Sequence, residues 1–208
     1  VLIGGGRSGI DLFQSLLDSH EEVLQFPDHF HFDEFWQEIK DTRDFEKIYE
    51  TFIKRYKKFF DSRLNEIERH NQLGDNKNQY YLVDEKKFKE ELRKFFKISD
   101  FNEYNVLKNF HLAYALSCNE DIEKKKILVI HLHHIRNIRN LTGIKFDTLM
   151  TIRDPLSSYS SLIRNWLNYN DGKNLSPYTF YFHLNRMFNG VKDISQISEN
   201  FIVIKLED

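Results

Sequence analysis

Short apolar runs and amphipathic segments alternate at both ends of this chain of 208 residues. The opening run "VLI" meets three glycines and then a segment with helical periodicity, which predicts a strand, a loop and a helix. After residue 126 the alternation returns, with apolar runs in "KILVIHLH", "FDTLMTIR" and "FIVIKL" and helical segments such as "HIRNIRNLTG" between them. Strands separated by helices predict an α/β fold with a parallel β-sheet flanked by helices.

The middle of the chain, residues 28–125, has a different pattern. It is rich in Lys, Glu, Asp and aromatic residues, and helical periodicity runs through "EFWQEIKDTRDFEKIYETFIKRYKKFFDSRLNEIERH", "DEKKFKEELRKFF" and "YNVLKNFHLAYALSC". We expect a mostly helical insertion on the acceptor side, over the carboxyl ends of the strands, where parallel sheets bind ligands. The predicted organisation is therefore one domain over residues 1–208, with the strand, loop and first helix in 1–27 and the rest of the sheet in 126–208.

Composition narrows the class of protein. The net charge of −2 gives no case for a nucleic-acid partner, and no apolar run approaches the roughly 18 residues that span a bilayer. The single cysteine, Cys118, excludes an internal disulfide and fits a reducing compartment, so we expect a cytoplasmic location. Because the chain begins inside a strand and ends just after one, we also expect a fragment that lacks the C-terminal part of its fold.

The loop "GGGRSGID" carries the first candidate chemistry. Its glycines allow a tight turn in which several N–H groups point at one oxyanion, and the following helix adds its positive end. Arg7 adds a full positive charge, while Phe13, Leu16 and Leu17 are expected to pack the helix on the sheet. A tight glycine turn without a ligand is the alternative. A Walker A loop would need Gly-Lys-Ser/Thr where this chain reads "SGID", which disfavours a nucleoside-triphosphate kinase.

The stretch "GGGRSGIDLFQSLLDSHEEVLQFP" resembles the opening of the sulfotransferase superfamily, whose pattern is close to Gly-x-Pro/Gly-Arg-Ser-Gly-Thr-Thr-Leu-Leu and, later, Leu-Leu-x-x-His-Pro. In that family the P-loop-like turn cradles the 5′-phosphosulfate of 3′-phosphoadenosine 5′-phosphosulfate (PAPS). The resemblance implies a donor-binding loop of Gly5, Gly6, Arg7, Ser8 and Gly9.

One departure from the family pattern falls at the start of the helix. The family's Thr-Thr pair is Ile10 and Asp11 here, so two hydroxyl groups are replaced by an alkyl group and a carboxylate. Asp11 either serves at the helix start and points away from the anion, or points inward and needs a cation as its partner.

The stretch "LMTIRDPLSSYSSLIRNW" supplies a second signature. Sulfotransferases carry a strand ending in Arg-Asp-Pro and then a helix with Ser eight residues after the Arg, which here are Arg153 and Ser161. By resemblance these two residues bind the 3′-phosphate of PAPS. Asp154 can cap the helix and Pro155 suits its first position. An ordinary capped helix with surface serines is the alternative, and helical spacing predicts an apolar face made of Leu156, Tyr159 and Ile163.

Three histidines follow the apolar run "KILVI". Strand alternation places His131 and His133 on one face and His134 on the other, and an imidazole with a reference pKa near 6.5 can accept a proton near neutrality. Cytosolic sulfotransferases carry Lys-x-His at a comparable strand end, so the resemblance implies His133 as the catalytic base. Structural histidines, a metal site at these positions, and a carboxylate base in the middle stretch remain alternatives.

Other features have simpler predictions. "FIVIKLED" resembles a later strand of the family, with Glu207 and Asp208 matching its acidic pair. The aromatic stretch "FPDHFHFDEFW" either lines an acceptor site or packs under the insertion. The Lys-rich runs are expected to be solvated helix faces, and His111 and Cys118 are expected in the core.

Together these features imply a PAPS-dependent sulfotransferase with Arg7 and His133 as catalytic residues. Its acceptor would carry a hydroxyl group, and a carbohydrate is one candidate. No metal is required. The alternatives are an inactive module that binds adenosine 3′,5′-bisphosphate or PAPS, and a P-loop phosphotransferase. The acceptor and the oligomeric state stay open.

Overall fold

The computed structural model describes residues 1–4, 8–18, 20–64, 73–132, 135–170, 178, 181–182, 185, 189 and 200–206. The chain divides into two compact units. The first combines Val1–Asp18 with Val129–Asp208, and the second is the continuous segment Ser19–Leu128 between them.

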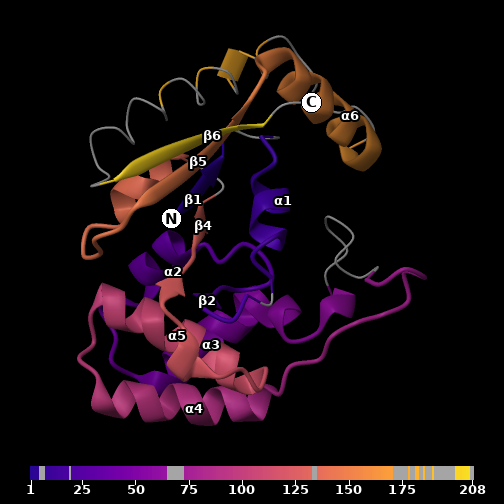
Figure 1. Ribbon diagram of the computed structural model, residues 1–208. Helices are drawn as coiled ribbons and strands as arrows, with labels where there is room; N and C mark the ends of the chain where they lie inside the picture. The colour runs from indigo at the N-terminus through magenta and orange to yellow at the C-terminus, as the bar shows by residue number, and fades with distance from the viewer. Residues whose placement is uncertain are drawn as a thin grey trace. The chain divides into compact units, whose positions relative to one another are not determined.

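The first unit contains a four-stranded sheet in the order β4-β1-β5-β6, in which every pairing is parallel (Figure 1). The predicted α/β class with a parallel sheet and helices is confirmed. The strands are β1 (Leu2–Gly4), β4 (His131–Leu132), β5 (Thr148–Arg153) and β6 (Phe201–Leu206). The helical elements are α1 (Ile10–Ser15), the 3-10 helix η5 (Ile135–Asn140) and α6 (Pro155–Asn170).

The short strand β1 lies inside the sheet, between β4 and β5. Its residue Ile3 is fully buried, and its neighbours Leu132 and Met150 are each 1% exposed. An all-apolar strand is what a central parallel strand needs, because helices cover both of its faces. The opening run "VLI" therefore supplies the centre of this sheet.

The buried face of α1 differs from the one predicted. Ile10 and Gln14, four residues apart, are the buried residues, whereas Leu16 is 71% exposed. The prediction that Leu16 packs on the sheet is wrong because the helix ends at Ser15, so Leu16 follows the last turn and no longer shares the buried stripe.

The apolar run "KILVIHLH" forms two strands instead of one. Its first part is β3 (Ile127–Leu128), which pairs in parallel with β2 (Val23–Leu24) in a separate two-stranded sheet of the second unit. Its second part is β4 in the first unit. The apolar run continues across the boundary between the units, so hydropathy alone could not show that it divides into two strands. The segment "HIRNIRNLTG", predicted as a helix, contains the 3-10 helix η5.

The second unit is mostly helical. Its α-helices are α2 (Phe32–Ile39), α3 (Phe45–Tyr56), α4 (Glu85–Ile98) and α5 (Glu103–Ser117), and α4 packs along α5. Short 3-10 helices occupy Lys57–Phe59, Ser62–Leu64 and Ile122–Lys124. Asp44 and Asp84 each accept two backbone N–H groups at the start of α3 and α4, and Asn102 accepts one at the start of α5.

Aromatic rings fill the core of the second unit. Phe52 lies near its centre, with the Phe110 ring 4.6 Å and the Phe88 ring 5.4 Å from its own ring centroid. The stretch "FPDHFHFDEFW" contributes its phenylalanines to this core, so its packing role is confirmed. Seven phenylalanines of the unit are the largest fully buried side chains: Phe26, Phe32, Phe35, Phe52, Phe59, Phe88 and Phe110.

His111 lies in the core, as the sequence predicts, whereas Cys118, also predicted in the core, is half-buried at the end of α5. His111 is 2% exposed, its ring centroid lies 4.5 Å from that of Phe26, and its Nδ1 lies 2.9 Å from the Leu107 carbonyl oxygen. Burial, with the charge of Glu120, raises the pKa of the half-buried Cys118 thiol to about 11. Both residues therefore serve packing in this unit.

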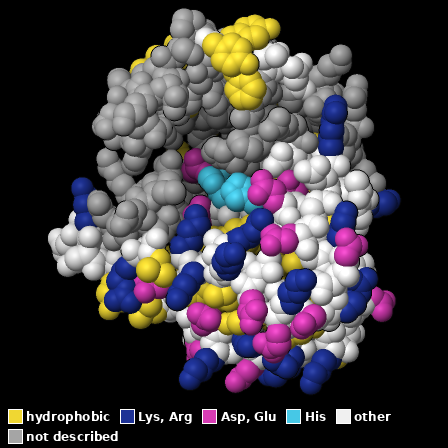
Figure 2. All heavy atoms as spheres, turned by 180° about the vertical axis from the view of Figure 1, so that it is seen from behind, with side chains coloured by type: hydrophobic (Ala, Val, Ile, Leu, Met, Phe, Trp, Pro, Cys, Tyr) yellow, Lys and Arg dark blue, Asp and Glu magenta, His cyan; other side chains and the backbone are white. Residues whose placement is uncertain are grey.

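The helix surface of the second unit mixes charges of both signs, as Figure 2 shows. Glu46 on α3 pairs with Lys89 at 2.7 Å and also with Arg93, both on α4. The Lys-rich run on α4 is thus a solvated helix face that carries its own counter-charges, as predicted, whereas Lys58 of the run "KRYKK" is part-buried. Across the part of the chain that the structure describes, no helix combines the length and apolarity that crossing a membrane would demand.

A largely buried charge pair joins two segments of the second unit. The Asp28 side chain is 11% exposed and binds the Lys58 ammonium, and its Oδ1 accepts the backbone N–H of His29 at 2.6 Å. Burial alone would raise the pKa of Asp28, but these hydrogen bonds and the nearby positive charges outweigh it and lower the pKa to about 2.

Asp28→Asn should destabilise the protein by about 2 kcal/mol at neutral pH, because the carboxylate is bound more tightly to its partners than to water. A folded-state pKa below the unfolded value means that this stability is fully present above pH 4 and is lost as the pH falls toward 2. Urea unfolding at several pH values should show the difference between variant and wild type shrinking over that interval. The exposed Asp41, changed to Asn, is the matched control, and an equal response of both variants would contradict the assignment.

Candidate functional site

The order of the strands marks one point of the sheet as the candidate for a ligand site. After β1 the next strand of this sheet is β4, which pairs on one side of β1, whereas β5 pairs on the other side and is followed by β6 further out (Figure 1). Among the described strands, the chain thus leaves β1 and β5 toward opposite edges. Parallel sheets bind ligands at such a switch point, beyond the carboxyl ends of the two strands.

Each of the two sequence signatures begins on one of these two strands and continues past its end. Gly4, the last residue of β1, pairs with Thr151 of β5, and β5 continues for two residues to Arg153. At about 3.3 Å per residue, the Arg153 backbone stands roughly 7 Å beyond the end of β1. The end of β1, where the glycine loop starts, and Arg153 therefore lie at the same end of the sheet.

Ser8 closes the far end of the glycine loop against β5. Its side chain is fully buried, and its Oγ lies 2.9 Å from the Oγ1 of Thr151, which is also fully buried. A Cβ on Gly4 would lie 2.6 Å from this Ser8 Oγ and 2.8 Å from the Ile10 Cβ, so no side chain fits at position 4. The two ends of the loop, at Gly4 and Ser8, are therefore in close contact.

Two features of the structure require that residue 9 has no side chain. Its φ of +80° lies in the left-handed region, and a Cβ there would lie 2.1 Å from the Cδ1 of Leu206 on β6. Its carbonyl accepts the Phe13 N–H at 3.0 Å, which is the first hydrogen bond of α1. Gly9 thus lies at the point where the loop becomes the helix, directly against a side chain of β6.

The start of α6 agrees with the second signature. Asp154 Oδ2 accepts the Ser157 N–H at 2.7 Å, and Pro155 is the first helical residue, so the predicted cap is confirmed. Arg153 and Ser161 are both half-buried. The predicted apolar face is wrong at Leu156, which is 73% exposed, while Ser158 is 4% exposed. In the first turn of α6 the inward position therefore belongs to a serine.

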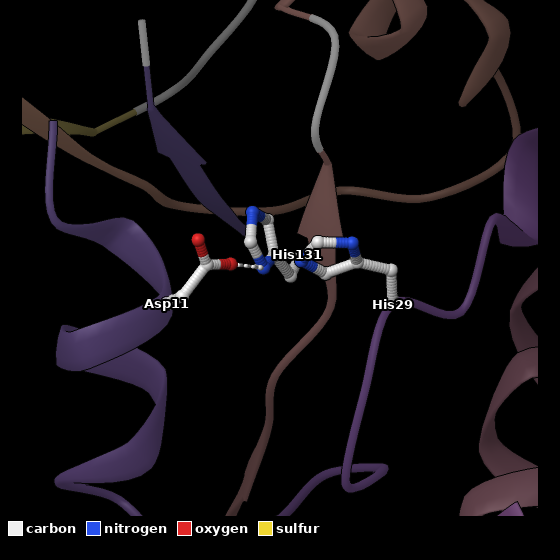
Figure 3. A group of neighbouring side chains, drawn as sticks. All are labelled: Asp11, His29 and His131. Carbon is white, nitrogen blue, oxygen red and sulfur yellow. Dashed lines mark ion pairs between the residues drawn. The ribbon is translucent and has the colours of Figure 1, made fainter. Parts of the chain in front are cut away.

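Asp11 points toward β4 (Figure 3). Its Oδ1 lies 3.7 Å from Nδ1 of His131, and the same nitrogen lies 2.8 Å from the Gln14 Oε1. Gly9, not Asp11, occupies the cap position of α1, where no side chain makes a capping bond. Asp11 and Gln14 are three residues apart on one face of α1, so both of them reach the imidazole.

His131 is 2% exposed and lies opposite Leu2 in the sheet. It therefore stands two residues before the level of Gly4, away from the edge where the two signatures meet. Its contacts with α1 give it a structural role, holding the helix against β4. The carboxylate that replaces a threonine of the family pattern thus has an imidazole beside it.

Half of the predicted site residues lie within the described structure. Ser8 and Gly9 lie at the end of the glycine loop, and Arg153 and Ser161 lie on β5 and α6. The remaining predicted residues, which are Gly5, Gly6, Arg7 and His133, lie outside the described residues, as do His134, Glu207 and Asp208.

Two residues escaped the sequence analysis. Thr151 precedes Arg153 by two positions and so shares its face of β5, and Gln14 interrupts the apolar stripe of α1. In both cases the sequence offered one signal, a polar residue at a position where the pattern of the strand or helix calls for an apolar one.

No family model matches this chain, and comparisons with curated proteins and with solved structures give no match either. The functional argument consequently rests on the geometry of the two strand ends.

Gly9→Ala should lower the free energy of unfolding by more than about 2 kcal/mol, because a left-handed residue with a Cβ costs about 1–2 kcal/mol before the contact with Leu206 is counted. Urea unfolding of Gly9→Ala, Leu206→Ala and the double variant would separate the two contributions. Leu206→Ala should relieve the contact but not the backbone strain, so the double variant should lose less than the sum of the single losses. Strictly additive losses would contradict the close approach.

Proposed function

We propose that this chain is a sulfotransferase that moves a sulfuryl group from PAPS to a hydroxyl acceptor. The observation that supports the proposal is the meeting of the two signatures, far apart in sequence, at the carboxyl ends of the adjacent strands β1 and β5. A chance glycine turn would have no reason to emerge beside an Arg-Asp-Pro signature at the switch point of the sheet.

The two strand ends suit the two phosphates of the donor. In this proposal the loop N–H groups and Arg7 hold the 5′-phosphosulfate, with Gly5, Gly6 and Gly9 allowing the close approach of the backbone. Arg153 and Ser161 hold the 3′-phosphate, for which a guanidinium and a hydroxyl are suitable donors. The half-buried position of Arg153 would strengthen such a contact relative to one in open water.

The reaction needs one bond formed and one broken. The acceptor oxygen bonds to sulfur while the bond from sulfur to the 5′-phosphate oxygen breaks, leaving the electron pair on adenosine 3′,5′-bisphosphate. Arg7 would stabilise that developing charge, and His133 would accept the proton of the acceptor hydroxyl. This chemistry calls for no metal. A carbohydrate hydroxyl is the acceptor class that we propose to test first.

The pairing of Asp11 bears on whether the donor site is functional. Its carboxylate lies beside the His131 imidazole, which supports donor binding despite the loss of the family's Thr-Thr pair. The same observation also supports a second candidate, a bisphosphate-binding module without transfer. Neither Ile10 nor Asp11 carries the hydroxyl that a threonine would offer to the sulfuryl group, and Ile10 is 4% exposed.

The single cysteine supports the cytoplasmic location predicted from the sequence, because a chain with one cysteine forms no internal disulfide.

Calorimetry should detect binding of adenosine 3′,5′-bisphosphate in preference to AMP and ATP. Arg153→Ala should weaken the affinity by about tenfold to a hundredfold, because a charge-assisted hydrogen bond contributes about 1.5–3 kcal/mol. Ser161→Ala should weaken it by about fivefold, the effect of one neutral hydrogen bond.

The matched control is Arg93→Ala on α4, which removes the same charge from the second unit and should leave the affinity unchanged. Equal affinities for Arg153→Ala and wild type would overturn the proposed donor site. An equal loss with Arg93→Ala would show that net charge, and not the site, governs binding.

Transfer itself is tested by incubating the protein with radiolabelled PAPS and a panel of sugar, alcohol and phenol acceptors. We expect a sulfated product whose formation falls at least about a hundredfold in His133→Ala, while bisphosphate affinity is retained. Tight bisphosphate binding without product from any acceptor would favour the second candidate instead.

A further inference from the structure

We infer that the hydroxyl of Ser8 is a positioning group, which acts through Thr151 to fix the glycine loop on β5, and not a ligand of the bound anion. This inference deepens the proposed function. The effect of the Ser8 hydroxyl on donor affinity rests on that function, whereas its effect on the loop does not.

The first argument is burial. Both side chains are completely buried, and their oxygens lie 2.9 Å apart in a contact that joins positions 143 residues apart in the chain. A serine hydroxyl that contacts a ligand needs a path to it, and this one is enclosed by β5 and by the turn at Gly4. The backbone N–H of Ser8 is the group left to contact an anion.

The second argument is the position of Thr151. It pairs with Gly4 in the sheet, so the loop is tied to β5 at the level where β1 ends. Thr151 and Arg153 are two residues apart on the same strand and therefore share one face. One hydrogen bond thus sets the end of the glycine loop against the strand segment that carries Arg153.

The third argument is that removing either hydroxyl leaves the other one buried without a hydrogen-bond partner. A buried hydroxyl without a partner costs more than the hydrogen bond contributes, so removing one partner should open the loop end, while removing both should add little. Direct ligation of the anion by Ser8 predicts the opposite. Ser8→Ala would then lower the donor affinity more than Thr151→Val does, and the two losses would add in the double variant.

The strand provides a matched control. Thr148 also lies on β5 and is 2% exposed, and among the described residues its Oγ1 has no hydrogen-bond partner. Thr148→Val therefore makes the same chemical change in the same strand without touching the loop. Thr151→Ser keeps the hydroxyl and is the conservative variant.

The test uses two readouts on Ser8→Ala, Thr151→Val, the double variant, Thr151→Ser and Thr148→Val. The first is the amide exchange rate of Phe13, whose N–H binds the Gly9 carbonyl and so reports whether the end of the loop is closed. The second is the affinity for adenosine 3′,5′-bisphosphate, measured well below the unfolding temperature of every variant.

We expect Phe13 to exchange about tenfold faster in Ser8→Ala, Thr151→Val and the double variant alike, with wild-type rates in Thr151→Ser and Thr148→Val. Affinity should fall about fivefold in the same three variants. Wild-type Phe13 exchange in Thr151→Val would overturn the inference, as would additive losses of affinity dominated by Ser8→Ala. If wild type binds no bisphosphate, the proposed function fails, but the Phe13 exchange rates still decide the role of Ser8.

Discussion

The parallel pairing of β1 between β4 and β5 is the constraint on which the first unit depends. Three residues of strand, Leu2–Gly4, bring together segments that the rest of the chain separates. Because the chain leaves β1 and β5 toward opposite edges of the sheet, the carboxyl ends of these two strands form the kind of switch point at which parallel sheets bind ligands. Of the candidate site residues that the structure describes, Arg153 ends β5, Ser8 and Gly9 follow β1, and Ser161 lies on the helix that follows β5.

A small number of contacts then shape this edge. The Ser8–Thr151 hydrogen bond and the approach of Leu206 to Gly9 hold the end of the loop from two neighbouring strands. On the other side of β1, α1 reaches β4 through the contacts of His131. The end of the loop, at Ser8 and Gly9, is thus attached to β5 and β6 by a hydrogen bond and by packing. A site preorganised in this way loses less conformational freedom when an anion binds.

Much of this could be predicted from the sequence, and the failures have physical causes. Alternating apolar runs and helices predicted the parallel sheet, and the Arg-Asp-Pro spacing predicted the cap of α6, because both depend on local pattern. The break between β3 and β4 could not be predicted, since an apolar run does not say which sheet receives it. The contacts of Thr151 and His131 were also hidden, because they join residues that are distant in the chain and meet only through strand register.

The role of Asp11 shows how register changes the interpretation of a substitution. Judged from the sequence, a carboxylate at the start of α1 opposes an anion site. In the fold, α1 runs beside β4, and the first polar side chain of that strand is an imidazole whose Nδ1 lies 3.7 Å from the carboxylate. Gln14 Oε1 lies 2.8 Å from the same nitrogen, and because an amide oxygen only accepts, Nδ1 carries a proton on the side of α1. Asp11 is thereby part of the contact between α1 and β4, a role that its place in the sequence does not indicate by itself.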